Sequence, residues 1–202
     1  MDFSVWKIYQ NFTLEHPLKK NLIWVTDMNN YRSAVIDKLI PYAREDKRII
    51  LLVSDMGFGV TDKFKEEFPD RFYNVGIMEQ GSVGIAAGMA MTGLIPVFYS
   101  IVNFLAFRAI EQVRNDVVLQ DLNVKFVSTG VNNYFKALGN SHICDEDDIK
   151  LMELINMPVY NPYKSSLCHC EEATVLPTWQ SENFDKLFDS WITSTKTGYI
   201  RV

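Results

Sequence analysis

The sequence predicts an α/β fold, a mostly parallel β-sheet with helices on both faces that together form a three-layer sandwich. Two observations predict it. Short apolar runs rich in β-branched residues alternate along the chain with longer segments of helical periodicity. These runs are continuously apolar, as in parallel strands that are buried on both faces. Ligands of such folds bind beyond the carboxyl ends of the strands.

The first predicted strand is Arg48 to Val53, an apolar run that follows the charged segment Arg44 to Lys47. A buried parallel strand that is entered from a loop is expected to have this pattern. Asp55 and Gly57 come just past its end. The first regular helix is expected to precede this strand.

A helix is predicted from Glu79 to Met91, in which small residues such as Gly84 and Gly88 recur. Their lack of bulk would let a neighbouring backbone come close. Gly93 is a typical residue for closing such a helix.

The alternation continues to the end of the chain, and its strands should end at a common edge. Asp55, Ser100 and Thr129 are therefore expected to share one rim of the sheet. The remaining predicted elements are a strand at Ile95 to Ser100, a helix at Asn103 to Leu119, a strand at Val124 to Ser128, a helix from about Asp145 to Ile155, a strand at Pro158 to Tyr160, a helix near Asn183 to Thr193 and a strand at Gly198 to Val202.

The first thirty residues differ from the rest because they carry an aromatic patch instead of an alternating pattern. We interpret residues 1–30 as an N-terminal arm that packs on its own domain or on a partner subunit. Residues 31–202 are expected to form one domain. The patch consists of Phe3, Trp6, Ile8, Tyr9 and Phe12.

Composition excludes several classes of function. The formal net charge is -5 and no basic stripe is present, so we do not expect nucleic acid as a partner. No window is apolar enough to span a bilayer, and a soluble, cytoplasmic protein without membrane contact is expected. Cys168-His169-Cys170 matches no usual zinc spacing, so we interpret it as incidental packing.

The most informative stretch is Phe68 to Gln80, which reads FPDRFYNVGIMEQ and leads into the small-residue helix. It resembles the pyrimidine-binding domain signature of transketolases and 1-deoxyxylulose-5-phosphate synthases. Further similarity lies in Phe104 to Asp116, in Ser141-His142 and in Tyr199 to Val202. The resemblance covers nearly the whole chain, and it implies the fold of a thiamine-diphosphate pyrimidine-binding domain.

Glu79 is the candidate catalytic residue. It follows the apolar stretch Val75 to Met78 at the start of a Gly/Ala-rich helix, and burial there would favour the protonated form of a carboxyl group. Such a group can share a proton with a ring nitrogen. The resemblance implies that it hydrogen-bonds N1′ of the aminopyrimidine of thiamine diphosphate and so activates the cofactor. The simpler alternative is a carboxylate that only favours the helix dipole.

The resemblance also implies cofactor-binding residues. Phe104 matches the aromatic residue that stacks on the aminopyrimidine, and Phe107 and Arg108 are candidates to line the same pocket. Asp55 and Met56 match a family segment that lies near the thiazolium. Considered without the family, the aromatic residues could be core residues and Asp55 a loop cap.

Arg32 and His142 are the candidate substrate-binding residues. Arg32 matches the arginine that opens the family's first helix and holds a sugar phosphate, a role suited to the forked donors of a guanidinium. A solvated surface arginine is the alternative. His142 matches a family histidine that hydrogen-bonds a substrate hydroxyl. The acidic run Asp145 to Asp148 beside it is interpreted as a helix N-terminus, and no metal ligands are assigned.

The sequence departs from the family in its substrate residues and in its length. Gly130 and Leu138 stand where the family has a histidine and an aspartate, and Gly57-Phe58-Gly59 replaces a phosphate-binding serine. No G-D-G motif of a diphosphate-binding domain is present. The resemblance therefore implies a partner subunit that supplies this domain and holds Mg²⁺ on the diphosphate, most simply as an α₂β₂ heteromer.

The leading hypothesis is a subunit of a split transketolase-like enzyme that transfers a two-carbon ketol or related acyl unit between sugar-like or oxo substrates. One alternative is a non-catalytic pyrimidine-domain paralogue that regulates a partner. Another is half of a 2-oxo acid decarboxylase or dehydrogenase, which shares the domain plan.

Overall fold

The computed structural model describes residues 31–163, 179–180 and 183–202. The predicted N-terminal arm, residues 1–30, and Cys168-His169-Cys170 lie outside these residues. Tyr31–Val202 forms one compact unit by its internal contacts. No helix among the described residues is long and apolar enough to cross a membrane.

The described residues form one sheet of seven strands in the order β2-β1-β3-β4-β7-β5-β6, and all paired strands are parallel. The predicted α/β class with a parallel sheet is therefore confirmed. The strands are β1 (Ile49–Val53), β2 (Phe72–Asn74), β3 (Ile95–Ile101), β4 (Lys125–Thr129), β5 (Val159–Asn161), β6 (Trp179–Gln180) and β7 (Gly198–Arg201).

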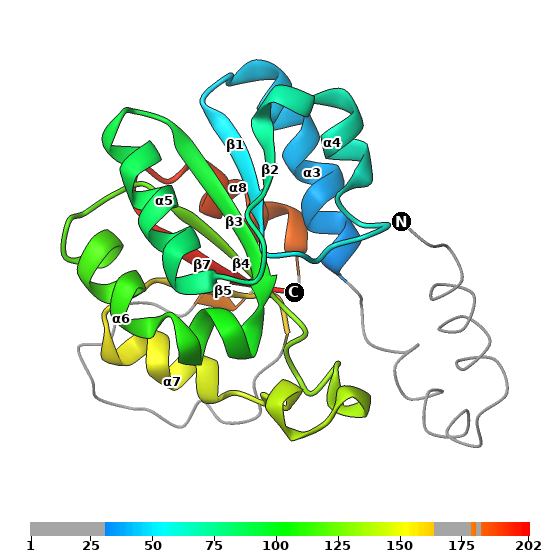
Figure 1. The fold of residues 1–202 in the computed structure, drawn as a ribbon, viewed down its shortest axis with the longest axis vertical. Helices are drawn as coiled ribbons and strands as arrows, with labels where there is room; N and C mark the ends of the chain where they lie inside the picture. The colour runs from blue at the N-terminus through cyan, green and yellow to red at the C-terminus, as the bar shows by residue number, and fades with distance from the viewer. Residues whose placement is uncertain (1–30, 164–178, 181–182) are drawn as a thin grey trace, which may run out of the picture. The chain divides into compact units, whose positions relative to one another are not determined.

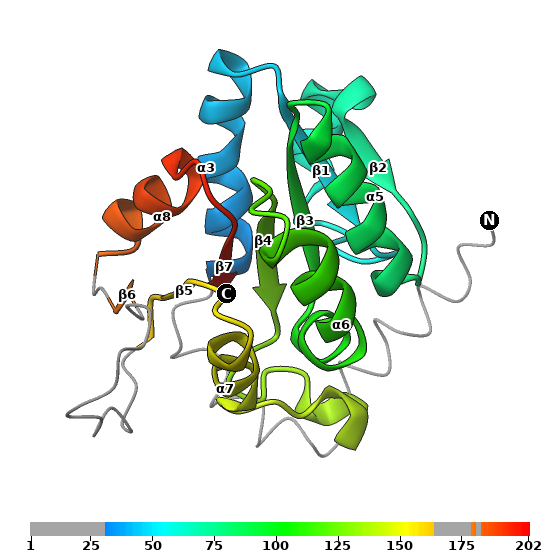
Figure 2. The same ribbon diagram turned by 90° about the vertical axis from the view of Figure 1, so that its left-hand side faces the viewer.

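Helices cover both faces of the sheet because successive strand residues point to opposite sides. Val97 and Tyr99 of β3 pack in one apolar cluster with α3 (Tyr31–Glu45), α4 (Asp62–Glu67) and α8 (Phe184–Thr193). Phe98, between them, packs in a second cluster. That cluster includes α5 (Glu79–Met91), α7 (Asp147–Leu154) and the helical region between β3 and β4. Figures 1 and 2 show the two layers of helices on either side of the sheet.

The prediction of one regular helix from Asn103 to Leu119 is wrong. The chain forms two wide π-type segments, η3 (Asn103–Arg108) and η4 (Val113–Val118), separated by a short α-helical turn, α6 (Ile110–Gln112). Ala109 interrupts them with φ −106° and ψ 12°. Besides Ala106, four buried residues recur at intervals of four positions, which drift around a helix of 3.6 residues per turn and drift less in wider turns. They are Leu105, Ala109, Val113 and Val117.

The α-helix α4, the strands β2 and β6 and the short 3-10 helices of the described residues were not predicted. β2 has only three residues, and the first is half-buried while the others are exposed. A strand this short has too few alternations to give a periodic signal. It nevertheless pairs with β1 through Leu51 and Phe72, and it leads directly to the loop before Glu79.

Candidate functional site

The carboxyl ends of β1, β3 and β4 form the rim on which the candidate residues lie. The strands are in register, with Val53 beside Tyr99 and Ile101 beside Thr129. Just past β1, the hydroxyl groups of Ser54 and Ser100 are hydrogen-bonded at 2.7 Å. The expected common rim is therefore present at this edge of the sheet.

Glu79 is the first residue of α5, and its side chain is 1% exposed. Met78 precedes it as a helix cap without a side-chain hydrogen bond, so the acid lies where the backbone N–H groups of the helix favour negative charge. Arg108 Nη1 donates a hydrogen bond of 2.7 Å to Glu79 Oε2. A buried carboxylate would be costly alone, and this pair compensates its charge.

Arg108 also lies over an aromatic ring. Its Cζ is 4.2 Å from the centroid of Phe104, within the range of a cation–π contact. The ring of His142 meets Phe104 edge-on, with centroids 5.1 Å apart and an interplanar angle of 76°. Four predicted site residues thus form one continuous line of contacts: Glu79, Arg108, Phe104 and His142.

Arg32 joins this line through Phe135. Its Cζ lies 5.0 Å from the ring centroid of Tyr134 and 5.1 Å from that of Phe135. The Phe135 ring in turn lies 6.5 Å from His142. Burial acts against the charge of Arg32, but interactions with Tyr99 and Tyr134 raise its pKa above the ordinary value.

Gly130 explains one departure from the family pattern. Its φ is +83°, and a Cβ atom there would lie 2.2 Å from Cδ2 of Phe135. The Phe135 ring therefore fills the space that a side chain at position 130 would need. Leu138, at the second departure, is 48% exposed.

Asn74 is a site residue that the sequence reasoning missed. Its Oδ1 accepts hydrogen bonds from the backbone N–H of Asp55 at 3.0 Å and of Gly76 at 3.1 Å. Its Nδ2 donates to Asp55 Oδ1 at 3.2 Å. One side chain thus connects the loop after β1 with the loop before Glu79. Its place in the FPDRFYNVGIMEQ stretch was the only available signal.

The remaining cofactor candidates lie apart from the Glu79 line. Asp55 is exposed and has a positive φ of 49°. Met56 packs against the apolar cluster on the α3 face of the sheet. Phe107 is 45% exposed. Asp55 is thus linked to the Glu79 loop by Asn74, while Met56 faces the core.

The loop that carries His142 is anchored by a buried ion pair at its base. Arg201 Nε donates to Asp148 Oδ2 at 2.9 Å, and both side chains are fully buried. Tyr199 donates to the same oxygen at 2.8 Å. Burial and the nearby Asp148 carboxylate raise the pKa of the Cys144 thiol to about 12, so this thiol stays protonated. Asp148 is therefore a structural residue of the acidic run, and Asp147 and Asp148 lie in the first turn of α7 as predicted.

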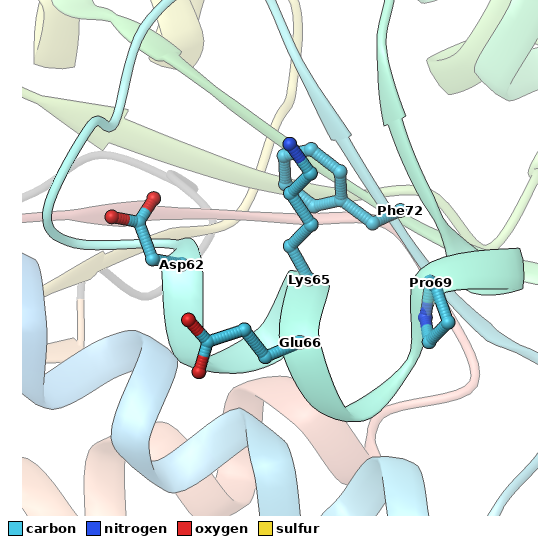
Figure 3. A pocket seen from close by; sticks show the side chains of 5 residues that line it. All are labelled: Asp62, Lys65, Glu66, Pro69 and Phe72. Carbon is cyan, nitrogen blue, oxygen red and sulfur yellow. The ribbon is translucent and has the colours of Figure 1, made fainter.

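Two further features concern ligands. No group of three or more His, Cys, Asp or Glu side chains among the described residues could hold a metal ion. A surface pocket of about 490 Å³ lies beside α4 and β2, and Figure 3 shows the Lys65 side chain next to the Phe72 ring there. It contains none of the candidate residues. Its lining is Asp62, Lys65, Glu66, Pro69 and Phe72.

The fold and the site define an α/β protein with a buried acid and an aromatic ring at the carboxyl edge of its parallel sheet. The family described as "Transketolase, pyrimidine binding domain" matches residues 27–169. The chain belongs to this family, whose transketolase members depend on thiamine diphosphate.

Several relatives are named as parts of transketolases or as related enzymes. The 6-deoxy-6-sulfo-D-fructose transketolase subunit of Clostridium sp. (strain MSTE9) is 33% identical over 136 residues, which are 67% of this chain and 42% of that protein. The 1-deoxy-D-xylulose-5-phosphate synthase of Clostridium kluyveri is 37% identical over 69% of this chain and 22% of its own length. A putative transketolase C-terminal section of Methanocaldococcus jannaschii is 37% identical over 62% of this chain and 40% of its own.

Solved structures share the fold. A split-gene transketolase, described as an inactive β4 tetramer, matches with a TM-score of 0.64 and 28% identity over 84% of this chain and 49% of that one. The transketolase of Pichia stipitis matches with a TM-score of 0.58 at 18% identity, over 79% of this chain and 23% of that one, and shows the fold alone. The chain therefore spans less than half the length of these relatives.

Proposed function

We propose that the chain is the pyrimidine-domain subunit of a split thiamine-diphosphate-dependent transketolase-like enzyme. The enzyme would transfer a two-carbon ketol or acyl unit between sugar-like substrates. One observation carries the proposal: the buried carboxylate of Glu79 lies at the carboxyl edge of the sheet, connected through Arg108 to the ring of Phe104. A purely structural ion pair would be expected to have both side chains buried, whereas the side chain of Arg108 is 41% exposed.

The side chains present fit the pyrimidine half of the cofactor. Phe104 would stack on the aminopyrimidine and Glu79 would hydrogen-bond its ring nitrogen, with Phe107, Arg108, Asp55 and Met56 as further candidates. When bound, thiamine diphosphate supplies a carbon nucleophile that accepts the ketol unit. Glu79 is the catalytic residue in this proposal because a buried acid can hold a proton at that nitrogen.

A partner subunit would supply the diphosphate half and Mg²⁺. The names of two similar proteins support this division, since one is a transketolase subunit and the other a split-gene transketolase. A natural docking surface is the outer side of α5, where Gly84 and Gly88 are exposed and leave open space, next to exposed Ile85 and Met91. We propose an α₂β₂ heteromer, with residues 31–202 as the pyrimidine domain and residues 1–30 as an arm.

The substrate would be a sugar with an anionic group. Arg32 offers a charged guanidinium at the rim, and His142 offers a ring nitrogen near Phe104. The name of the sulfosugar transketolase subunit is consistent with an anionic ketose as one substrate class. The Phe135 ring in the space above Gly130 supports a substrate that differs from the usual pentose phosphates.

A second candidate function is a non-catalytic paralogue that binds and regulates a partner. The changed positions 130 and 138 favour it, while Glu79, Arg108 and Phe104 favour catalysis. A 2-oxo acid decarboxylase or dehydrogenase half has no separate support in the site. Offering ketoses and 2-oxo acids side by side to the reconstituted enzyme distinguishes it from the transketolase.

The test is calorimetric binding of thiamine diphosphate with Mg²⁺, first to the chain alone and then to the chain co-expressed with the protein from the neighbouring gene. Binding is expected only in the complex. In that complex Glu79→Gln should lower turnover by several orders of magnitude, because an amide can hydrogen-bond the ring nitrogen but cannot give it a proton. Glu111→Gln, an exposed acid on α6, is the matched control and should leave turnover unchanged. Full activity of Glu79→Gln contradicts the proposed function.

A further inference from the structure

The Arg108 side chain makes two contacts at once, and both are to residues that the proposed function assigns to the cofactor. Its guanidinium Cζ lies over the Phe104 ring, 4.2 Å from the centroid, and its Nη1 donates a hydrogen bond of 2.7 Å to Glu79. An aminopyrimidine is also a planar group that stacks on an aromatic ring and hydrogen-bonds a carboxyl group through a ring nitrogen. Resting on the proposed function, we propose that Arg108 competes with the aminopyrimidine for Phe104 and Glu79 and must move aside for it.

Arg108 is the member of this cluster that can move. Its side chain is 41% exposed, whereas Glu79 is 1% exposed at the start of α5. Phe104 belongs to η3, which is held by the buried Leu105 and Ala106. Arg108 itself ends η3, next to the break at Ala109. The guanidinium can therefore turn toward solvent without unpacking the core.

Because Glu79 is buried, Arg108 can leave only if the aminopyrimidine replaces it as the partner of the carboxyl group. If Arg108 left alone, a carboxylate would remain buried without a counter-charge, which is strongly unfavourable. The cost is reduced when another polar group takes over the hydrogen bond to the carboxyl group. Arg108 thus occupies the carboxyl group of Glu79 before binding, and the ring nitrogen of the aminopyrimidine takes its place as the hydrogen-bond partner.

The experiment measures binding of 4-amino-5-hydroxymethyl-2-methylpyrimidine, the free aminopyrimidine fragment, to the isotopically labelled full chain by NMR. Arg108→Met removes both contacts, and we expect binding to tighten by about five- to thirty-fold, the scale of one cation–π contact and one half-exposed ion pair. Arg108→Lys keeps a charge but has no plane to stack, and it should give an intermediate value. If Arg108→Met folds poorly, Arg108→Lys still tests the competition.

Arg114→Met is the matched control because Arg114 is exposed and its Nη1 bonds to Asn115, away from Glu79. It should bind like the unchanged chain. A second readout is the carboxyl ¹³C signal of Glu79, assigned with Glu79→Gln, which should shift when the fragment binds because the hydrogen-bond partner of the carboxyl group changes.

The outcomes separate this inference from the proposed function. Equal or weaker binding by both Arg108 variants overturns the competition and leaves the proposed function standing, with Arg108 as a residue that helps to hold the pyrimidine. Failure of the fragment to bind the unchanged chain and every variant also overturns the competition, and it leaves the proposed function standing, because that function expects cofactor binding only in the complex and is tested there.

Discussion

Two ion pairs among the residues that the structure describes contain a buried carboxylate, and they differ in the exposure of the arginine. In the pair of Asp148 and Arg201 both side chains are fully buried, and Tyr199 completes the carboxylate's hydrogen bonds. In the pair of Glu79 and Arg108 the carboxylate is buried but the arginine is 41% exposed. The first arrangement can only be structural, because neither partner can exchange. The second leaves an acid that a ligand can reach once its arginine moves.

The largest expected effect is in the fully buried pair. Arg201→Met should lower the free energy of unfolding by about 3 to 5 kcal/mol, because Asp148 would remain buried without a counter-charge. Urea denaturation measures this change. Lys150→Met is the control, since its pair with Asp147 is exposed on both sides and should be worth about 0 to 1 kcal/mol. Similar losses in the two variants would remove the distinction between the buried and exposed pairs.

Lys125 is a buried cation that forms no ion pair with any acid in the described part of the chain. Its Nζ donates to the carbonyl oxygens of Ser194 and Lys196, and burial lowers its pKa from 10.5 to about 7. Between these two pH values the unfolded chain holds a proton that the folded chain has released. Stability should therefore rise as pH increases from about 7 toward 10.5, and the full penalty is present below pH 7.

Lys125→Met lacks this titration, so the difference between its unfolding free energy and that of the unchanged chain should depend on pH. We expect the unchanged chain to gain about 2 to 4 kcal/mol relative to the variant between pH 6 and pH 10. Denaturant titrations at several pH values measure it. Parallel curves would mean that the two carbonyl groups hold the lysine charged throughout.

A smaller effect on stability is expected for Gly130, on the substrate side of the rim. Gly130→Ala should cost about 1 to 3 kcal/mol, because φ is +83° and the new methyl group would lie 2.2 Å from the Phe135 ring. Gly139→Ala is the matched control, with a φ of +102° and open space around the added atom. The difference between the two variants isolates the contact with Phe135. A larger loss in Gly139→Ala would contradict the packing argument.

The sequence predicted the elements that have strong local signals. The helix Glu79–Met91 was predicted with its observed bounds, since a small-residue run ends there before Gly93, and the strands around it are apolar runs. The three-residue β2 and the π-type turns were missed, because three residues carry no period and a wider turn depends on packing.

Parts of the site could not be predicted from local patterns. The contact between Arg108 and Glu79 joins residues 29 positions apart, and nothing local indicates that the arginine would turn toward the acid. The position of the Phe135 ring beside Gly130 could not be predicted from the sequence either, since both the loop and the positive φ come from tertiary packing. The family resemblance indicated the candidate residues of the site, and the fold determines their contacts.

The smallest expected effect on stability, and the most specific for function, is at Asn74. The residue is exposed, so Asn74→Ala should cost only about 1 kcal/mol in urea denaturation, despite its three hydrogen bonds. Its removal frees the loop of Asp55 from the loop before Glu79. In the reconstituted complex, we therefore expect a loss of thiamine-diphosphate affinity of at least tenfold, well beyond the loss of stability.

Asn74→Asp keeps the acceptor for both N–H groups but places a second carboxylate against Asp55, so it should separate the two roles. If it binds as well as the unchanged chain, the backbone contacts alone hold the two loops together; if Asn74→Ala binds equally well, the connection has no part in cofactor binding.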